Sequence, residues 1–265
     1  MTIRNIRRIL KEAKDAGIEW IFFEGGEPFL YYALLVQGVR CAASSGFHIG
    51  VLSNGYWATD FEDALECLRP FAGLIQDFTI SSDLYHHNKA MSEQAEYAKA
   101  AAEKLGIPIG VISIAQPEVT DSAATLGKLP LGESTVMYRG RAATVLASRA
   151  VKQPWKQFVK CTRERLQDPG RVHVDPLGNM HVCQGISIGN LYRAPLGELC
   201  ERYSPESDPI IGPLLDGGPV ELIHRYRLPH EEEYADACQL CYEARRALRT
   251  RFPDVLGPDQ MYGVI

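Results

Sequence analysis

The amino-acid sequence predicts an α/β fold, in which helices cover a parallel sheet, followed by a smaller α+β domain. Two observations predict it. Short apolar runs alternate with helical patterns over roughly the first 150 residues, and several runs end in glycine, serine or asparagine. Near residue 150 this alternation gives way to two short strand-like segments joined by a turn. We therefore expect one domain at residues 1–150 and a second at 151–265.

The elements of the first domain follow from periodicity. A helix is expected over residues 4–16, because Ile6, Ile9, Leu10 and Ala13 recur on one helical face and Gly17 can cap its end. The same reasoning gives strands over 18–23, 49–52, 78–81, 107–114 and 135–138, and helices over 29–45, 60–68 and 89–105. Such an order forms a parallel sheet with right-handed crossovers, and ligands bind beyond the carboxyl ends of its strands.

The second domain is expected to begin with a β-hairpin. Residues 171–174 and 180–182 alternate apolar and polar side chains, and Pro176-Leu177-Gly178-Asn179 between them is typical of a turn. Helices are expected at 195–203, 209–225 and 239–251.

The composition excludes several classes of partner. The net charge of −5 comes from 33 acidic and 28 basic residues that are interspersed, so no basic tract indicates nucleic acid or an anionic membrane. No apolar run reaches the length of about 18 residues needed to cross a bilayer, and the charged amphipathic start is unlike a signal peptide. We expect a cytoplasmic protein that binds a small molecule or a peptide.

Polar groups follow three of the predicted strands. They are Gly25, Gly26, Glu27 and Pro28 after the first, Ser53 and Asn54 after the second, and Ser82 and Asp83 after the third. A glycine pair by itself is more typical of a tight turn. Three polar clusters at one edge of a sheet favour a small-molecule site, and their groups suit a ribose and an amino-acid head group.

Four of the seven cysteines form a second candidate site. They are Cys161, Cys183 at the end of the predicted hairpin, and the pair Cys238 and Cys241 at the start of a helix. Clustered cysteines in a large cytosolic chain favour a metal over disulfides. The spacing alone is compatible with a [4Fe-4S] cluster, a tetrahedral zinc ion or unligated core thiols. Cys41, Cys67 and Cys200 lie in helical patterns and are interpreted as structural.

The motifs FFEGGEPFL, VLSNGYWA and TISSDLYH resemble, in this order, those of the radical S-adenosylmethionine (SAM) superfamily. The resemblance implies a partial (β/α)6 TIM-like barrel over residues 1–150. The backbone of residues 25–28 would receive the SAM amino group. Ser53, Asn54, Ser82 and Asp83 would lie near its ribose or methionine portion.

Residues 151–265 resemble the shortened, twitch form of the SPASM domain that follows the barrel in this superfamily. The resemblance rests on Cys161, Gly178, Cys183 and the CxxC pair Cys238 and Cys241, and it implies one auxiliary [4Fe-4S] cluster. Members of the family cleave SAM reductively and abstract hydrogen from a substrate. The implied partners are a peptide or small-molecule substrate and a reductant protein such as ferredoxin or flavodoxin.

One motif of the family has no counterpart here. The CxxxCxxC loop after the family's first strand is missing, and the sequence shows five strands where six are typical. We interpret this as loss of the first strand with its loop, with Met1 an internal methionine of a longer protein, so that this chain is inactive by itself. Two alternatives are a naturally degenerate site and a non-catalytic iron-sulfur or zinc-binding protein that keeps the fold.

A few further residues have open roles. Tyr85, His86 and His87 could contact a substrate or cap a helix. His173 and His181 could tune a cluster or pack in the hairpin, and Arg139 could face a ligand or solvent.

Overall fold

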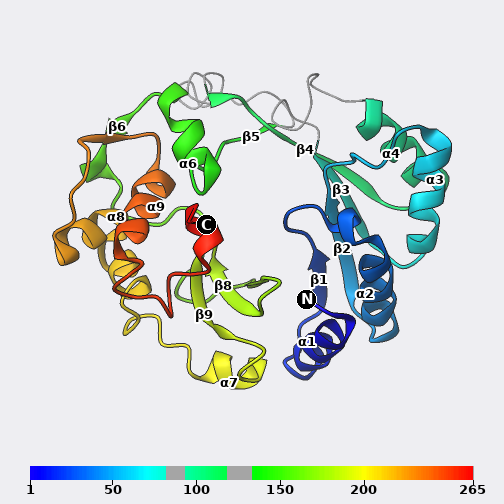
Figure 1. The fold of residues 1–265 in the computed structure, drawn as a ribbon, viewed down its shortest axis with the longest axis horizontal. Coiled ribbons are helices and arrows are strands. Elements are labelled where there is room, and N and C mark those ends of the chain that lie inside the picture. Colours follow the sequence, from blue (N-terminus) through cyan, green and yellow to red (C-terminus); the bar gives the residue numbers. More distant parts are fainter. Residues whose placement is uncertain (82–92, 118–132, 265) are drawn as a thin grey trace. The chain divides into compact units, whose positions relative to one another are not determined.

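The computed structural model describes residues 1–81, 93–117 and 133–264 (Figure 1). The chain forms two compact units. The first contains the described residues up to Gln116 together with residues 133–135, and the second contains Pro117 and the residues from Val136 onward. The predicted division near residue 150 therefore falls inside the second unit, because Ala143 and its helix pack into that unit's core.

The first unit contains a parallel sheet, as predicted. Four strands lie in the order of the chain, and all neighbours are parallel: β1 (Trp20–Phe23), β2 (His48–Ser53), β3 (Asp77–Ser81) and β4 (Ile109–Ile114). A two-residue strand, β5 (Glu133–Ser134), pairs in parallel with β4. This arrangement confirms the α/β class and the parallel sheet.

Four helices of this unit lie together on one side of the sheet (Figure 1). They are α1 (Ile3–Asp15), α2 (Tyr32–Ser44), α3 (Phe61–Leu68) and α4 (Glu93–Lys104), and the 3-10 turns η1 (Pro28–Tyr31) and η2 (Arg69–Phe71) precede α2 and follow α3. The predicted helical face of α1 is confirmed for Ile6, Leu10 and Ala13, which are buried, whereas Ile9 is only half-buried. Trp20 and Phe22 alternate with the helix-facing residues of β1 and are exposed.

The strand predicted over residues 135–138 is wrong. The strand of this region ends at Ser134, and Val136 and Tyr138 are buried beyond it without belonging to a strand. The backbone N–H of Tyr138 donates to Asp236 Oδ2 at 3.4 Å. The alternating apolar residues that predicted a strand are therefore buried residues of the second unit.

The second unit has a three-stranded antiparallel sheet of β7 (His173–Val174), β8 (Asn179–Cys183) and β9 (Ile186–Asn190). The predicted hairpin is confirmed as β7 and β8, whereas β9 was not predicted. Its register with β8 is irregular, so its apolar residues do not follow a regular alternation. A second, two-stranded pair joins β6 (Gln153–Pro154) to β10 (Glu233–Tyr234).

Four helices accompany these strands: α6 (Arg141–Val145), α7 (Leu196–Glu201), α8 (Ile211–Tyr226) and α9 (Ala237–Leu248). Short 3-10 turns are η3 (Ala147–Arg149), η4 (Trp155–Gln157) and η5 (Asp259–Tyr262). The core between them includes Ile210, Leu222 and Leu240, all fully buried. This core holds the start of α9 and the end of β8 together, which is where three of the clustered cysteines lie.

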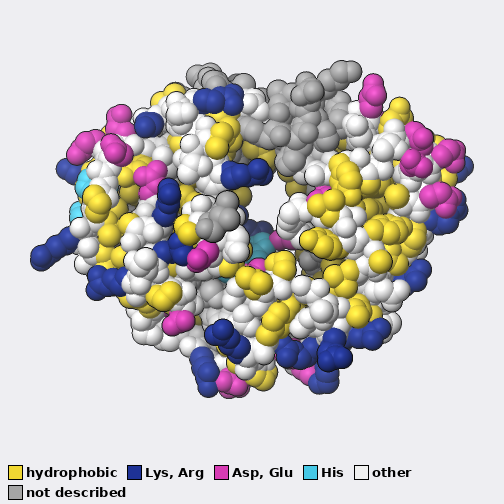
Figure 2. Space-filling view, viewed as in Figure 1, with side chains coloured by type: hydrophobic (Ala, Val, Ile, Leu, Met, Phe, Trp, Pro, Cys, Tyr) yellow, Lys and Arg dark blue, Asp and Glu magenta, His cyan; other side chains and the backbone are white. Residues whose placement is uncertain are grey.

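Charged side chains of both signs are spread over the visible surface of each unit, with hydrophobic side chains between them (Figure 2). In the described part of the chain, no helix combines the length and apolar character needed to cross a membrane.

Candidate functional site

One buried carboxylate ties together the loops that follow β1 and β2. Glu27 is 8% exposed, and its Oε1 accepts hydrogen bonds from the Phe29 N–H (3.0 Å) and the Ser53 hydroxyl (2.9 Å). Its Oε2 accepts from the Asn54 N–H at 2.7 Å. Glu27 also caps the 3-10 turn η1. The structure therefore brings together two of the three predicted polar clusters.

The Ser53 hydroxyl is engaged within the protein as well. Besides donating to Glu27, it accepts from the Trp57 indole N–H (2.8 Å) and the Gly55 N–H (3.1 Å). Asn54 Oδ1 accepts from the Tyr56 N–H at 3.1 Å. These side chains shape the edge of the sheet, and the glycine loop beside them is uncrowded, since a Cβ on Gly25 would meet no atom within 4 Å.

The third cluster, Ser82 and Asp83, lies outside the described residues, as do Tyr85, His86 and His87.

The four clustered cysteines are brought together. Cys238 and Cys241 lie in the first turns of α9, Cys183 ends β8, and Cys161 lies in the loop after η4. All seven cysteines are free thiols. Burial raises the pKa of Cys238 strongly and that of Cys241 to about 11, and Cys183 acts on both. Cys161 also acts on the pKa of Cys241, so the four thiols are neighbours.

The side-chain positions do not form a ready site for a single ion. Within residues 1–81, 93–117 and 133–264, no group of three or more His, Cys, Asp or Glu side chains is placed to hold a metal ion. The donor set fits a thiophilic metal by its chemistry, because four free thiols are neighbours in a half-buried setting. Metal binding would require these side chains to turn toward a common centre.

A buried arginine lies beside the thiols. Arg245 is 1% exposed, and its guanidinium donates to the carbonyl oxygens of Gln184 (2.7 Å) and Cys241 (3.3 Å) and to the Tyr262 hydroxyl (3.3 Å). All three acceptors are neutral. Burial lowers the pKa of Arg245, but the neighbouring Cys241 and Tyr262 raise it by more, so the net pKa is above its usual value.

A second arginine contacts the site directly. Arg139 Nη1 donates to Cys183 Sγ at 3.6 Å and pairs with Glu164 at 3.3 Å. The sequence leaves open whether Arg139 faces a ligand or solvent. In the structure, Arg139 contacts Cys183, one of the cysteines proposed to ligate a metal.

Local structure places each cysteine. Asp236 caps α9 by accepting from the Gln239 N–H at 2.7 Å, which orients the turn that carries Cys238. Gly218 packs against the segment before Cys161, since a Cβ on it would lie 2.2 Å from the Lys160 nitrogen. Its φ of +65° is also one that residues with side chains rarely adopt.

The turn that leads into β8 is organised by a buried ion pair. Asp175 Oδ1 accepts from the N–H groups of Leu177 and Asn179, at 2.8 and 2.9 Å. Its Oδ2 lies 3.2 Å from His181 Nε2, and both side chains are buried. His181 therefore serves the hairpin by this contact. Cys41, Cys67 and Cys200 lie in α2, α3 and α7, and Cys200 is exposed.

The sequence interpretation missed Arg245 and Asp236. Arg245 follows Cys241 by four residues on a predicted helix, so the two share a helical face. Asp236 precedes the helix at the position typical of a cap. Both signals are present in the sequence, but the burial of Arg245 depends on contacts with Gln184 and Tyr262.

Comparison with known proteins gave no relatives: no family model matches this chain, and a search of curated proteins found no match.

Proposed function

We propose that this chain is a radical SAM-type protein that binds SAM at the edge of the parallel sheet and one auxiliary [4Fe-4S] cluster in its second unit. Cys161, Cys183, Cys238 and Cys241 would hold the cluster, which supplies one-electron chemistry when bound. The sequence motifs support the SAM half of this proposal. The partial (β/α) barrel of the first unit and the membership of this chain in the radical SAM superfamily are proposed on the same motifs.

Arg245 is the observation that carries the cluster half. A buried charge is costly unless a charge of opposite sign compensates it. The guanidinium has only neutral hydrogen-bond partners, and the ionisable groups that act on it most are Cys241, Tyr262 and Cys183. Thiolates that ligate a metal would supply the missing negative charge. Arg139, in contact with Cys183, favours the same charge state.

The hydrogen bonds of Glu27 support the proposed SAM site. That carboxylate holds the glycine loop next to Ser53 and Asn54 without a ligand, so the edge is organised in advance. The space around Gly25 and Gly26 is open, so a ligand can approach their backbone.

Anaerobic reconstitution with iron and sulfide tests the cluster. We expect about four iron and four sulfide per chain, as a [4Fe-4S] cluster requires, and the double variant Cys238→Ala, Cys241→Ala should lose most of both. Cys200→Ala is the matched control, because Cys200 is exposed in α7, and it should bind as much iron as the unmodified chain.

Two outcomes contradict the cluster. Stoichiometric zinc with no retained iron or sulfide would show a zinc site, and equal iron in the double variant and in Cys200→Ala would show nonspecific binding. The first outcome favours the alternative of a non-catalytic zinc protein.

Calorimetric titration with SAM tests the other half. Gly25→Ala should weaken SAM binding by about tenfold, because a side chain at φ +95° forces this backbone to change. Gly73→Ala is a matched control in the same unit, with φ +71° and equally open space. Equal SAM affinities in the two variants would contradict a site at the glycine loop. These 265 residues contain no CxxxCxxC, so we expect no 5′-deoxyadenosine from this chain.

A further inference from the structure

The second unit contains a cavity of about 390 Å³ whose lining is basic and polar. Its charged and hydrogen-bonding residues are Arg141, Arg246, Gln184, Gln260, Tyr242 and Tyr262. Among the described residues of the lining, none is acidic. The volume is within the range of about 300–1,000 Å³ typical of small-molecule sites.

Arg141 and Arg246 are exposed arginines of the cavity lining. Arg202, Arg225 and Arg249 each form an ion pair with a nearby carboxylate. For Arg141 and Arg246, no ion pair is formed within the part of the chain that the structure describes. Two guanidiniums and two primary amides therefore offer donors around one cavity without a compensating carboxylate in its lining.

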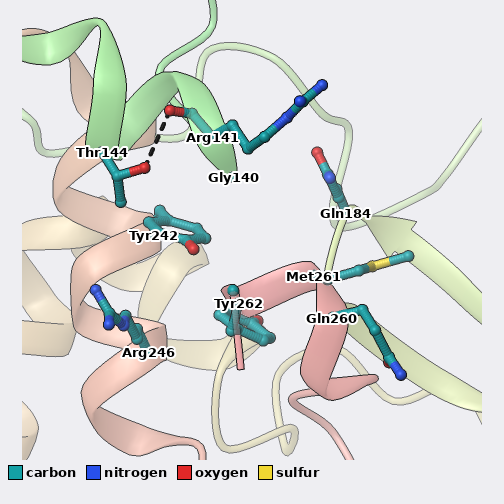
Figure 3. Close-up of a pocket in the computed structure, with 10 residues that line it drawn as sticks. Gly140, Arg141, Thr144, Gln184, Tyr242, Arg246, Gln260, Met261 and Tyr262 are labelled. Atoms are coloured by element: carbon teal, nitrogen blue, oxygen red, sulfur yellow. Dashed lines mark hydrogen bonds between the residues drawn. The ribbon is translucent and has the colours of Figure 1, made fainter. Parts of the chain in front are cut away.

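The floor of the cavity is rigid. Figure 3 shows Tyr242 and Tyr262 in the middle of the lining, with Arg246 on one side of them and Arg141 and Gln184 on the other. The two tyrosine rings are buried and stacked, with centroids 5.7 Å apart. The Tyr262 hydroxyl donates to the Gly185 carbonyl at 2.7 Å and accepts from Arg245. A ligand would therefore meet preformed walls.

The cavity adjoins the four-cysteine site. Gln184 directly follows Cys183, and Tyr242 directly follows Cys241. Tyr262 lines the cavity and is hydrogen bonded to Arg245, which in turn contacts the carbonyl of Cys241. A bound molecule would thus lie close to the proposed cluster.

We infer that this cavity binds a small organic anion, recognised through a carboxylate or phosphate group by one of its two arginines, Arg141 or Arg246. The inference deepens the proposed function, because it names the chemical class of molecule bound beside the cysteines. Guanidinium groups match both kinds of anion with paired, charge-assisted hydrogen bonds. The glutamine amides add neutral donors.

Calorimetric titration with benzoate, with inorganic phosphate and with neutral benzamide tests the inference. We expect benzoate or phosphate to bind one per chain, and benzamide to bind at least tenfold more weakly. Either Arg141→Gln or Arg246→Gln, whichever removes the guanidinium that pairs with the anion, should weaken anion binding by about tenfold, the loss of one charged hydrogen-bonding group. Arg193→Gln, an exposed arginine of the same unit outside the cavity, should leave the affinity unchanged.

The outcomes separate this inference from the cluster. Comparison of benzoate with phosphate shows which anionic group is preferred. Absence of binding by both anions, equal binding of benzamide, or equal losses in Arg193→Gln would overturn the inference. Iron content is measured on the same samples, so loss of anion binding with iron retained leaves the proposed cluster intact, and the reverse result leaves the cavity intact.

Discussion

Glu27 in the first unit and Arg245 in the second are both buried at a candidate site, but their surroundings differ. Glu27 accepts from three donors on two loops of its own unit. Arg245 also makes three hydrogen bonds, but its ionisable neighbours include three cysteine thiols. Glu27 thus has hydrogen-bond partners on two loops of its own unit, whereas Arg245 has neutral acceptors and, under the proposed function, would gain negative charge from metal-bound thiolates.

Under the proposed function, Glu27 serves folding, whereas Arg245 serves binding of the cluster. Replacing Glu27 should harm the protein in the absence of any ligand. Replacing Arg245 should be tolerated until metal is added. The following experiments are ordered from the largest expected effect to the smallest.

The largest loss of stability is expected from replacing Gly218, because Gly218 packs against the segment that carries Cys161. Gly218→Ala places a Cβ 2.2 Å from the Lys160 nitrogen at a φ of +65°. Backbone strain and overpacking together should lower the free energy of unfolding by about 4 kcal/mol. Urea unfolding measures the loss, and iron uptake should fall with it because Cys161 shifts.

Gly197→Ala is the control for Gly218, since a Cβ there meets nothing within 4 Å and the residue is in α7. It should be neutral or stabilise by up to about 1 kcal/mol. Similar stabilities of the two alanine variants would show that the backbone contact before Cys161 is unimportant.

Glu27→Ala comes next. Removing the carboxylate leaves the N–H groups of Phe29 and Asn54 without their acceptor, which should cost about 3 kcal/mol in metal-free protein. Glu27→Gln keeps one acceptor oxygen and should lose about 1 kcal/mol. Chemical unfolding measures both against Glu103→Ala, an exposed site in α4. If Glu27→Ala is as stable as this control, the carboxylate does not hold the loops.

Arg245→Met, unlike Glu27→Ala, should not destabilise the metal-free protein. In metal-free protein, the variant should be unchanged or more stable by up to about 2 kcal/mol, because an apolar side chain of similar length replaces an uncompensated cation. After reconstitution it should retain less iron than the unmodified chain. Arg193→Met, at an exposed position, is the control. A large loss of stability in metal-free Arg245→Met would mean that the neutral partners already compensate the charge.

The smallest effect is expected at Asp175, a buried charge whose partner is itself ionisable. Burial raises its pKa, but hydrogen bonds from His181 and Asn179 lower it by more, so the net pKa is below the usual value. The resulting stability is present above the unfolded pKa of about 3.9 and is lost as pH falls through the lower folded pKa.

Asp175→Asn should therefore lower stability at neutral pH and flatten the decline below about pH 4. Urea midpoints measured from pH 2 to 7 check this. Asp168→Asn is the control, because Asp168 is 85% exposed and pairs only at the surface. If the urea midpoints of Asp175→Asn change with pH as those of the unmodified chain do, the contact between Asp175 and His181 does not stabilise the hairpin.

The sequence by itself determined the elements whose signals are local. The apolar face of α1 and the turn before β8 both depend on residues within a few positions of each other. The periodicity of the apolar residues therefore predicted the alternation of strands and helices in the first unit. The cysteine spacing predicted that Cys161 and Cys183 lie near Cys241. Local patterns could not give β9, whose pairing is irregular, nor the end of the strand at Ser134.

Only the tertiary structure decided how the two buried charges are surrounded. Glu27 meets Ser53 and Asn54 across 26 and 27 residues, and Arg245 meets Gln184 across 61. Whether a charged side chain is solvated, compensated or left for a ligand depends on groups that the chain brings together from such distances. Sequence periodicity reports which side of an element is buried, whereas the charge balance inside the fold is a property of the assembled core.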